Sequence, residues 1–201
     1  MSTSTVFAVL APLPELALRG SERVARQSSH ARLAVHASAG VAGATLGALE
    51  KNVDDVPLPS AGWFWSPSHS RASVAGVVHR AAVGIDVEDA REVRTELRER
   101  VLNPAERALL DAHDAVAFLR AWTAKEALLK ELHLGLGGLA RCSIVAVETS
   151  DTMLVTCDGA RRRVRQFVSV ERVASVSTAD DASVTWVILA APFESAVEVR
   201  A

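Results

Sequence analysis

The sequence predicts an α+β fold built from two packed lobes. Helix-like and strand-like segments occur in runs, without the strict strand–helix alternation of a doubly wound sheet. The chain has 201 residues, enough for one large domain or two small lobes, and 49% of them are hydrophobic, so a sizeable core can form. We expect the boundary near Ala82, with an N-terminal lobe of residues 1–81 and a C-terminal lobe of residues 82–201.

The N-terminal lobe begins with a strand-like run and a long helical segment. The run Val6–Leu10 is apolar and is followed by two prolines, as in a strand or its remnant. Residues 15–49 are rich in Ala, Arg and Leu and are expected to be mainly helical, with an interruption at their glycines. Residues 54–62 contain prolines and glycine and predict a loop. A brief aromatic strand at 63–65 should then lead into a polar turn at 66–70.

The middle of the chain reads as a hairpin followed by helices. Two apolar runs, Ser73–His79 and Ala82–Glu88, are joined by a short polar connection, which predicts a β-hairpin. Residues 89–101 form a charged helix candidate. An Asn-Pro pair then predicts an N-cap and a first-turn proline for a helix over 104–111.

The last third changes from helix to strand. Asp114 is placed to cap a helix that continues to about His133 and ends at Gly135. Short β-rich runs separated by Gly or Asp turns follow at 143–147, 153–156, 163–170 and 184–190.

Composition excludes several classes of protein. A net charge of -2 argues against a general nucleic-acid binder. Cys142 and Cys157 are too few for a disulfide framework or a zinc site, so we expect them to pack as free thiols in a reducing compartment. The N-terminus lacks a signal-peptide pattern, and no apolar run reaches transmembrane length. A soluble, cytoplasmic protein that binds no membrane is expected.

Two acidic segments far apart in the chain suit one metal site. Asp86 and Glu88 alternate with aliphatic residues, so on a strand both carboxylates point to one face. Trp122, Glu126 and Lys130 recur every four residues, so on a helix they share a face. Alone, each pattern is typical of a solvated surface. Together, three carboxylates and an ammonium suit a magnesium ion and a phosphate group.

Lysine usage supports this interpretation. The chain is rich in arginine but has only the lysines Lys51, Lys125 and Lys130. Two of them lie in one short helical stretch, which suggests a need for a compact point charge.

Three motifs, in order and at similar spacing, resemble those of the 4'-phosphopantetheinyl transferase superfamily. They are Ser68-His69-Ser70, Gly84-Ile85-Asp86-Val87-Glu88 and Trp122-Thr123-Ala124-Lys125-Glu126-Ala127-Leu128-Leu129-Lys130, and Gly135-Leu136-Gly137 resembles the glycine stretch that follows them. The similarity is to the larger, pseudo-dimeric type that acts on nonribosomal peptide, polyketide and fatty acid synthase carrier proteins. It implies two similar lobes related by a pseudo-two-fold axis. Each would be a small antiparallel sheet with helices, and the active site would lie in the cleft between them.

The resemblance also implies an activity. A monomeric enzyme would transfer the phosphopantetheine arm of coenzyme A to a serine of an apo acyl or peptidyl carrier protein, with Mg²⁺, and would release adenosine 3',5'-bisphosphate. Asp86, Glu88 and Glu126 would be the metal ligands, and Asp86, Glu126 and Lys130 the catalytic residues. Lys130 would contact the leaving phosphate. The base for the serine is either Glu126 or a metal-bound water relayed by a carboxylate.

Further residues are implied in binding coenzyme A. Ser68 and His69 would contact a phosphate, and Arg26 and Arg32 the 3'-phosphate, unless these arginines form only a solvated helix face. Lys125 is either supporting structure or a secondary phosphate contact. Trp122 is assigned to the core and not to the site.

Departures from the family pattern keep other hypotheses open. Val56-Pro57-Leu58-Pro59 replaces a Gly-Lys-Pro turn that contacts adenine, so the chain could instead be a module of the same fold that binds carrier protein or coenzyme A without turnover. A different Mg²⁺-dependent phosphotransferase is a weaker alternative. Two basic stretches, Arg91/Arg94/Arg98 and Arg161–Arg165, could dock an acidic carrier or could simply be solvated.

Overall fold

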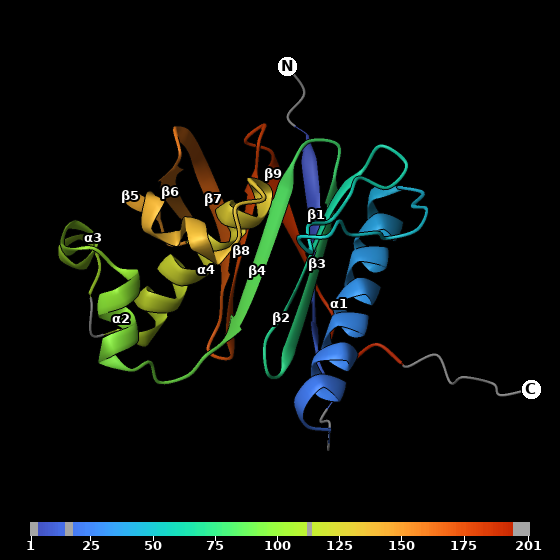
Figure 1. Ribbon diagram of the computed structural model, residues 1–201, viewed down its shortest axis with the longest axis horizontal. Coiled ribbons are helices and arrows are strands. Elements are labelled where there is room, and N and C mark those ends of the chain that lie inside the picture. Colours follow the sequence, from blue (N-terminus) through green and yellow to red (C-terminus); the bar gives the residue numbers. More distant parts are fainter. Residues whose placement is uncertain (1–3, 15–17, 112–113, 195–201) are drawn as a thin grey trace, which may run out of the picture.

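Two β-sheets, each covered by one long helix, make up the computed structural model, which describes residues 4–14, 18–111 and 114–194 (Figure 1). The first sheet has the order β2-β3-β1-β9, with bounds β1 (Thr5–Pro12), β2 (Phe64–His69), β3 (Ser73–His79) and β9 (Ser183–Ile188). The second has the order β4-β8-β7-β6-β5, with bounds β4 (Val83–Asp89), β5 (Cys142–Thr149), β6 (Thr152–Cys157), β7 (Ala160–Val168) and β8 (Arg172–Thr178). The predicted α+β class and the two-lobed arrangement are confirmed.

The helices cover the outer faces of the two sheets. Helix α1 (Gly20–Ala42) packs on the first sheet and α4 (Ala115–Glu131) on the second. Three short helices make connections: α2 (Thr95–Val101) and α3 (Pro104–Leu109) between β4 and α4, and the 3-10 helix η1 (Leu136–Arg141) between α4 and β5. Among the described residues, every helix is too short or too polar to cross a membrane.

The inner faces of the two sheets pack against each other through small and branched apolar side chains. Alternate residues of β1 meet alternate residues of β4 in one buried cluster, which includes Ile85 and Val87. Because successive side chains of a strand point to opposite faces, burial of these two residues between the sheets directs Asp86 and Glu88 toward α4. The core packing therefore decides which face of β4 carries the carboxylates.

The predicted hairpin of Ser73–His79 with Ala82–Glu88 is wrong. Strand β3 already pairs on one side with β1 and on the other with β2, so it has no free edge for β4. Strand β4 pairs instead with β8 in the second sheet. The chain passes between the sheets near Ala82, and β9 returns to pair in parallel with β1.

The predicted polar turn at 66–70 is also wrong, because β2 extends through His69. Ser66 and Ser68 are buried in this strand, and each hydroxyl accepts a hydrogen bond from a backbone N–H of β4. Strand β8 was missed because Ser175 and Ser177 interrupt its apolar pattern. Both serines are buried and hydrogen-bonded to α4 side chains.

The predicted N-caps of two helices are confirmed, whereas two other helices are shorter than predicted. Asp114 accepts a hydrogen bond from the backbone of Val116 at the start of α4, and Asn103 with Glu106 forms a capping box on α3. Helix α1 ends before Gly43, whose φ of 65° is left-handed, so residues 44–49 are not helical; residues 15–17 lie outside the described part. Helix α2 begins at Thr95 and is shorter than the predicted segment 89–101.

One glycine in each sheet lets a helix backbone approach unusually closely. A Cβ at Gly76 of β3 would lie 2.2 Å from the backbone nitrogen of Val35 in α1. A Cβ at Gly84 of β4 would lie 2.0 Å from the carbonyl oxygen of Ala127 in α4. Both distances are far below van der Waals contact, so each helix can pack this closely on its sheet only because the residue in the strand is glycine.

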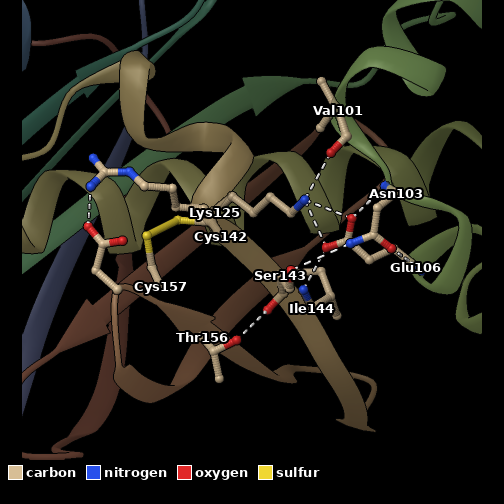
Figure 2. Close-up of a disulfide and its surroundings, with 11 residues drawn as sticks. Val101, Asn103, Glu106, Lys125, Cys142, Ser143, Ile144, Thr156 and Cys157 are labelled. Carbon is tan, nitrogen blue, oxygen red and sulfur yellow. Dashed lines mark hydrogen bonds and ion pairs between the residues drawn. A yellow bond between two sulfur atoms is a disulfide. The ribbon is translucent and has the colours of Figure 1, made fainter.

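The two cysteines are joined, contrary to the expectation of free thiols. Cys142 at the start of β5 and Cys157 at the end of β6 form a disulfide, and both are buried (Figure 2). They are direct cross-strand partners with Cα atoms 4.2 Å apart, below the limit of about 7 Å beyond which two cysteines cannot be bridged without backbone movement. Strand pairing, which the sequence did not reveal, brings them together.

Gly84→Ala should destabilise the protein, because the added methyl group meets backbone atoms that cannot move independently. We expect the free energy of unfolding to fall by about 1–3 kcal/mol in chemical denaturation. Gly40→Ala is the matched control: this glycine lies in α1 with open space around it, and the change should be neutral or stabilising by up to about 1 kcal/mol. Equal stability of the two variants would contradict the close contact between α4 and β4.

Reduction of the disulfide should lower the melting temperature. The cysteines are 15 residues apart, and a loop of that length is stabilised by about 3 kcal/mol in the chain-entropy model. A Cys142→Ala/Cys157→Ala variant should melt at the same temperature with and without dithiothreitol. Peptide mass spectrometry of protein purified without reductant checks the bond, and two free thiols there would contradict it.

Candidate active site

A cavity of about 650 Å³ gathers polar residues from both halves of the chain. Its lining includes Ser68 and His69 from β2, Asp86 and Glu88 from β4, Trp122, Glu126 and Lys130 from α4, Ser28 and Arg32 from α1, and Lys51 and Asp55 from the loop before β2. Six residues that the sequence singled out for metal or phosphate binding therefore lie on the wall of one space, together with Arg32.

Asp86 is the most enclosed of these carboxylates. Its side chain is 8% exposed, and its Oδ1 accepts hydrogen bonds from the Lys130 ammonium at 2.7 Å and the Ser68 hydroxyl at 2.8 Å. Lys130 also donates to Ser68 Oγ at 3.1 Å and to the carbonyl oxygen of Ile85 at 3.0 Å. The ammonium on α4 thus binds directly to the strand that carries the carboxylate.

The other oxygen of this carboxylate has no partner. Asp86 Oδ2 is buried and makes no hydrogen bond, although an unsatisfied buried polar atom normally costs about 1–3 kcal/mol. A hard cation would satisfy this oxygen, and the neighbouring carboxylates are the donors that Mg²⁺ prefers. The donor set fits such an ion chemically.

The side chains do not surround one point as they stand. Within the described ranges, no group of three or more His, Cys, Asp or Glu side chains is close enough to hold a metal ion together. An ion bound by Asp86, Glu88 and Glu126 would therefore require rotation of at least one side chain.

Glu88 and Glu126 share a low-polarity, negatively charged environment. Burial and then the charge of Asp86 raise the pKa of Glu126 to about 7, against a smaller opposing effect of Lys130. The same two causes raise the pKa of Glu88, whose carboxylate accepts hydrogen bonds from Trp122 Nε1 at 3.2 Å and Arg91 at 3.4 Å. Burial raises both pKa values because it disfavours the charged form of a carboxyl group.

His69 and Arg32 also line the cavity. Burial and the nearby Lys130 lower the pKa of His69, so its imidazole is mainly neutral at pH 7 and can donate one hydrogen bond. Its Nε2 lies 3.5 Å from the hydroxyl of Ser28. Arg32 donates to the carbonyl oxygen of Leu49 and stacks over Trp65 with 5.4 Å between the guanidinium carbon and the ring centroid.

A second cavity of about 630 Å³ shares wall residues with the first, namely Lys51, Asp55, Pro67 and Lys130. Much of its remaining lining is apolar: Val56, Pro57, Trp65, Leu129 and Leu134. Lys51 donates to Asp55 at 2.8 Å, and sequence reasoning missed both. The scarcity of lysine was a signal that could have singled out Lys51.

Three further residues singled out in the sequence are Lys125, Arg26 and Trp122, and for Lys125 the structure selects the first of its two alternatives, supporting structure. Lys125 lines neither cavity: it is 1% exposed, and its ammonium donates to Glu106 at 2.8 Å and to the Val101 carbonyl at 2.9 Å (Figure 2). It is supporting structure, because its position on α4 turns it away from Glu126. Arg26 is not part of either lining. Trp122 packs against the core cluster of the second sheet, as predicted, and its indole also lines the cavity and donates a hydrogen bond to Glu88.

Several arginines of the two basic stretches bind neighbouring groups of the chain. Arg91 pairs with Glu88, and Arg98 is buried and donates to the Val93 carbonyl. Arg163 pairs with Glu148 and Asp181. A role in docking a partner stays a prediction for both stretches.

Comparison with known proteins points to one family. The family model described as the 4'-phosphopantetheinyl transferase superfamily, ACPS, matches residues 82–185, just over half of the chain. The matched segment contains Asp86, Glu88, Glu126 and Lys130. No curated protein matches the chain.

Glu126→Gln should stabilise the protein at alkaline pH when divalent ions are removed by EDTA. Folding raises the pKa of Glu126 from 4.5 to about 7, so the folded state holds a proton in this window that the unfolded state has lost. The free energy of unfolding therefore falls as pH rises from 4.5 to 7, and the glutamine variant escapes that loss.

At pH 8 we expect the variant to be more stable by about 1–3 kcal/mol, with the difference disappearing near pH 4.5. Chemical denaturation at several pH values measures it. Glu92→Gln, which removes an exposed carboxylate outside the cavity, is the control. A constant difference between Glu126→Gln and wild type across the window would contradict the raised pKa.

Proposed function

The chain belongs to the 4'-phosphopantetheinyl transferase superfamily, and we propose that it transfers the 4'-phosphopantetheine arm of coenzyme A to a serine of an apo acyl or peptidyl carrier protein. Phosphoryl transfer requires the enzyme to position the nucleophile and neutralise charge on the donor. The observation that carries the proposal is the buried carboxylate of Asp86, with its unpartnered Oδ2, on the wall of a cavity that also contains Glu126, Lys130 and His69.

Asp86, Glu88 and Glu126 are the residues that would hold Mg²⁺. All three offer carboxylate oxygens, and Mg²⁺ sites typically combine one or two protein carboxylates with substrate phosphates and water. Bound there, the ion would supply charge neutralisation for the pyrophosphate of coenzyme A.

The cavities suggest how the donor lies. His69 and Arg32 line the same cavity as the carboxylates and would bind phosphate oxygens of the donor. The second cavity, with Pro57 and Trp65 in its lining, offers apolar surface for the adenosine end. Lys51 lies on the wall that both cavities share and supplies a cation where the family's glycine–lysine pair is missing.

The proton and bond changes can be assigned to atoms. The carrier serine Oγ forms a bond to the phosphorus next to pantetheine, and the bond from that phosphorus to the bridging oxygen breaks. Adenosine 3',5'-bisphosphate leaves with the bridging oxygen. The serine proton passes to Glu126, whose carboxylate lines the cavity beside Asp86 and Lys130.

A binding module of the same fold without turnover is the second candidate. It is favoured by the absent glycine–lysine pair and by the side chains of Asp86, Glu88 and Glu126, which do not surround one point as they stand. Turnover would then be absent even though coenzyme A or carrier protein binds.

Incubation with apo carrier protein, coenzyme A and Mg²⁺ separates these functions. We expect the carrier to gain the mass of the phosphopantetheine arm, as measured by intact-protein mass spectrometry. Glu126→Gln should lower the rate by at least about 100-fold through loss of the base, and Lys130→Ala should lower it strongly through loss of the charge beside Asp86. Glu92→Gln should leave the rate unchanged.

Other results would favour the alternatives. Binding of coenzyme A or carrier protein without a mass gain supports the module. Protection against thermal unfolding by ATP and not by coenzyme A would support a different phosphotransferase.

A further inference from the structure

Ser68 is bound to the metal-site carboxylate and not exposed to the cavity as a free hydroxyl. We propose that Ser68 and Lys130 form a clamp that fixes Asp86, occupying Oδ1 and leaving Oδ2 as the one oxygen of this carboxylate for a divalent ion. Ser68 is then a positioning residue, whereas the sequence motif assigned it to a coenzyme A phosphate. This inference rests on the proposed function, because it concerns the same site.

The hydrogen-bonding capacity of Ser68 is already used. A serine hydroxyl has one proton to donate and two lone pairs that accept. Ser68 Oγ donates to Asp86 Oδ1 at 2.8 Å and accepts from the backbone N–H of Val87 at 3.3 Å and from Lys130 at 3.1 Å. The residue is 6% exposed. A phosphate could bind this hydroxyl only by breaking one of these bonds.

The hydrogen-bonding capacity of Lys130 is also fully used. An ammonium has three protons to donate, and the three acceptors of Lys130 are Asp86 Oδ1, Ser68 Oγ and the carbonyl oxygen of Ile85, at 2.7, 3.1 and 3.0 Å. Its charge neutralises the Asp86 carboxylate, and its bonds to β4 fix the distance between that strand and α4.

The clamp joins groups from three elements. Ser68 comes from β2, Lys130 from α4, and the carboxylate of Asp86 from β4. Rotation of the carboxylate would break both hydrogen bonds to Oδ1. Groups that orient a metal ligand in this way typically change metal affinity or activity by about 10–100-fold when they are removed.

Ser68→Ala tests the clamp through two separate affinities. Isothermal titration with Mn²⁺, on protein without coenzyme A, should show divalent affinity lowered by about 10–100-fold. Coenzyme A affinity, measured at saturating Mn²⁺, should remain within about twofold of wild type because the hydroxyl does not contact the donor. If the alanine variant does not fold, Ser68→Cys carries the same test, since a thiol is a weak hydrogen-bond donor.

Ser66→Ala is the matched control. Ser66 is also buried in β2, and its hydroxyl accepts from the Ile85 N–H of β4 at 3.1 Å, but it makes no hydrogen bond to a carboxylate among the described residues. Its loss should reduce stability by a similar amount and leave Mn²⁺ affinity unchanged.

Three results would overturn the clamp. If Ser68→Ala binds coenzyme A more weakly but Mn²⁺ as tightly as wild type, Ser68 contacts the donor and does not position Asp86. If both affinities are unchanged, Ser68 contributes to neither site. In either case wild-type transfer would persist and the proposed function would stand. If wild-type protein neither binds Mn²⁺ nor modifies a carrier, the proposed function and the clamp fail together.

Discussion

The buried carboxylate of Asp86 is the group on which the candidate site depends. Its position follows from the alternation of β4: Ile85 and Val87 fill the space between the two sheets, so Asp86 and Glu88 point to the side of α4. A carboxylate at this depth is tolerated because Lys130 neutralises it and Ser68 donates to it. The unpartnered Oδ2 keeps one oxygen available, which a purely structural ion pair would not require.

Helix α4 can present Glu126 and Lys130 to this carboxylate because its other contacts fix it from several directions. Its backbone lies against Gly84. On another face, Lys125 forms a buried ion pair with Glu106, which also accepts the backbone N–H of Ile144 at 2.6 Å, and so α3 and β5 are tied to the helix (Figure 2). Near its end, Glu131 binds Ser177 of β8 and Arg162 of β7. Loss of one buried partner of such a pair would leave an uncompensated charge.

Local sequence patterns predicted the strand and the helix that carry the carboxylates and Lys130, and long-range pairing decided the rest. The caps Asn103 and Asp114 and the alternation around Asp86 are local features, so the helices after β4 and the acidic strand could be predicted. The pairing of β4 with β8, the burial of Ser68 in a strand and the Cys142–Cys157 bond depend on partners far along the chain. The buried serines of β2 and β8 form hydrogen bonds with such distant partners, but in the sequence alone their polar character is typical of a turn. For the same reason the core packing of Trp122 could be predicted but its hydrogen bond to Glu88 could not, since that bond joins residues 34 apart.

The divalent ion can be located directly by its anomalous signal in a crystal structure with coenzyme A and Mn²⁺. We expect one ion bound to Asp86 Oδ2, with Glu126 turned toward it, the pyrophosphate of coenzyme A on the same ion, and Lys130 still bonded to Oδ1. An ion held elsewhere, or coenzyme A bound outside the cavity between β2, β4 and α4, would contradict this expectation.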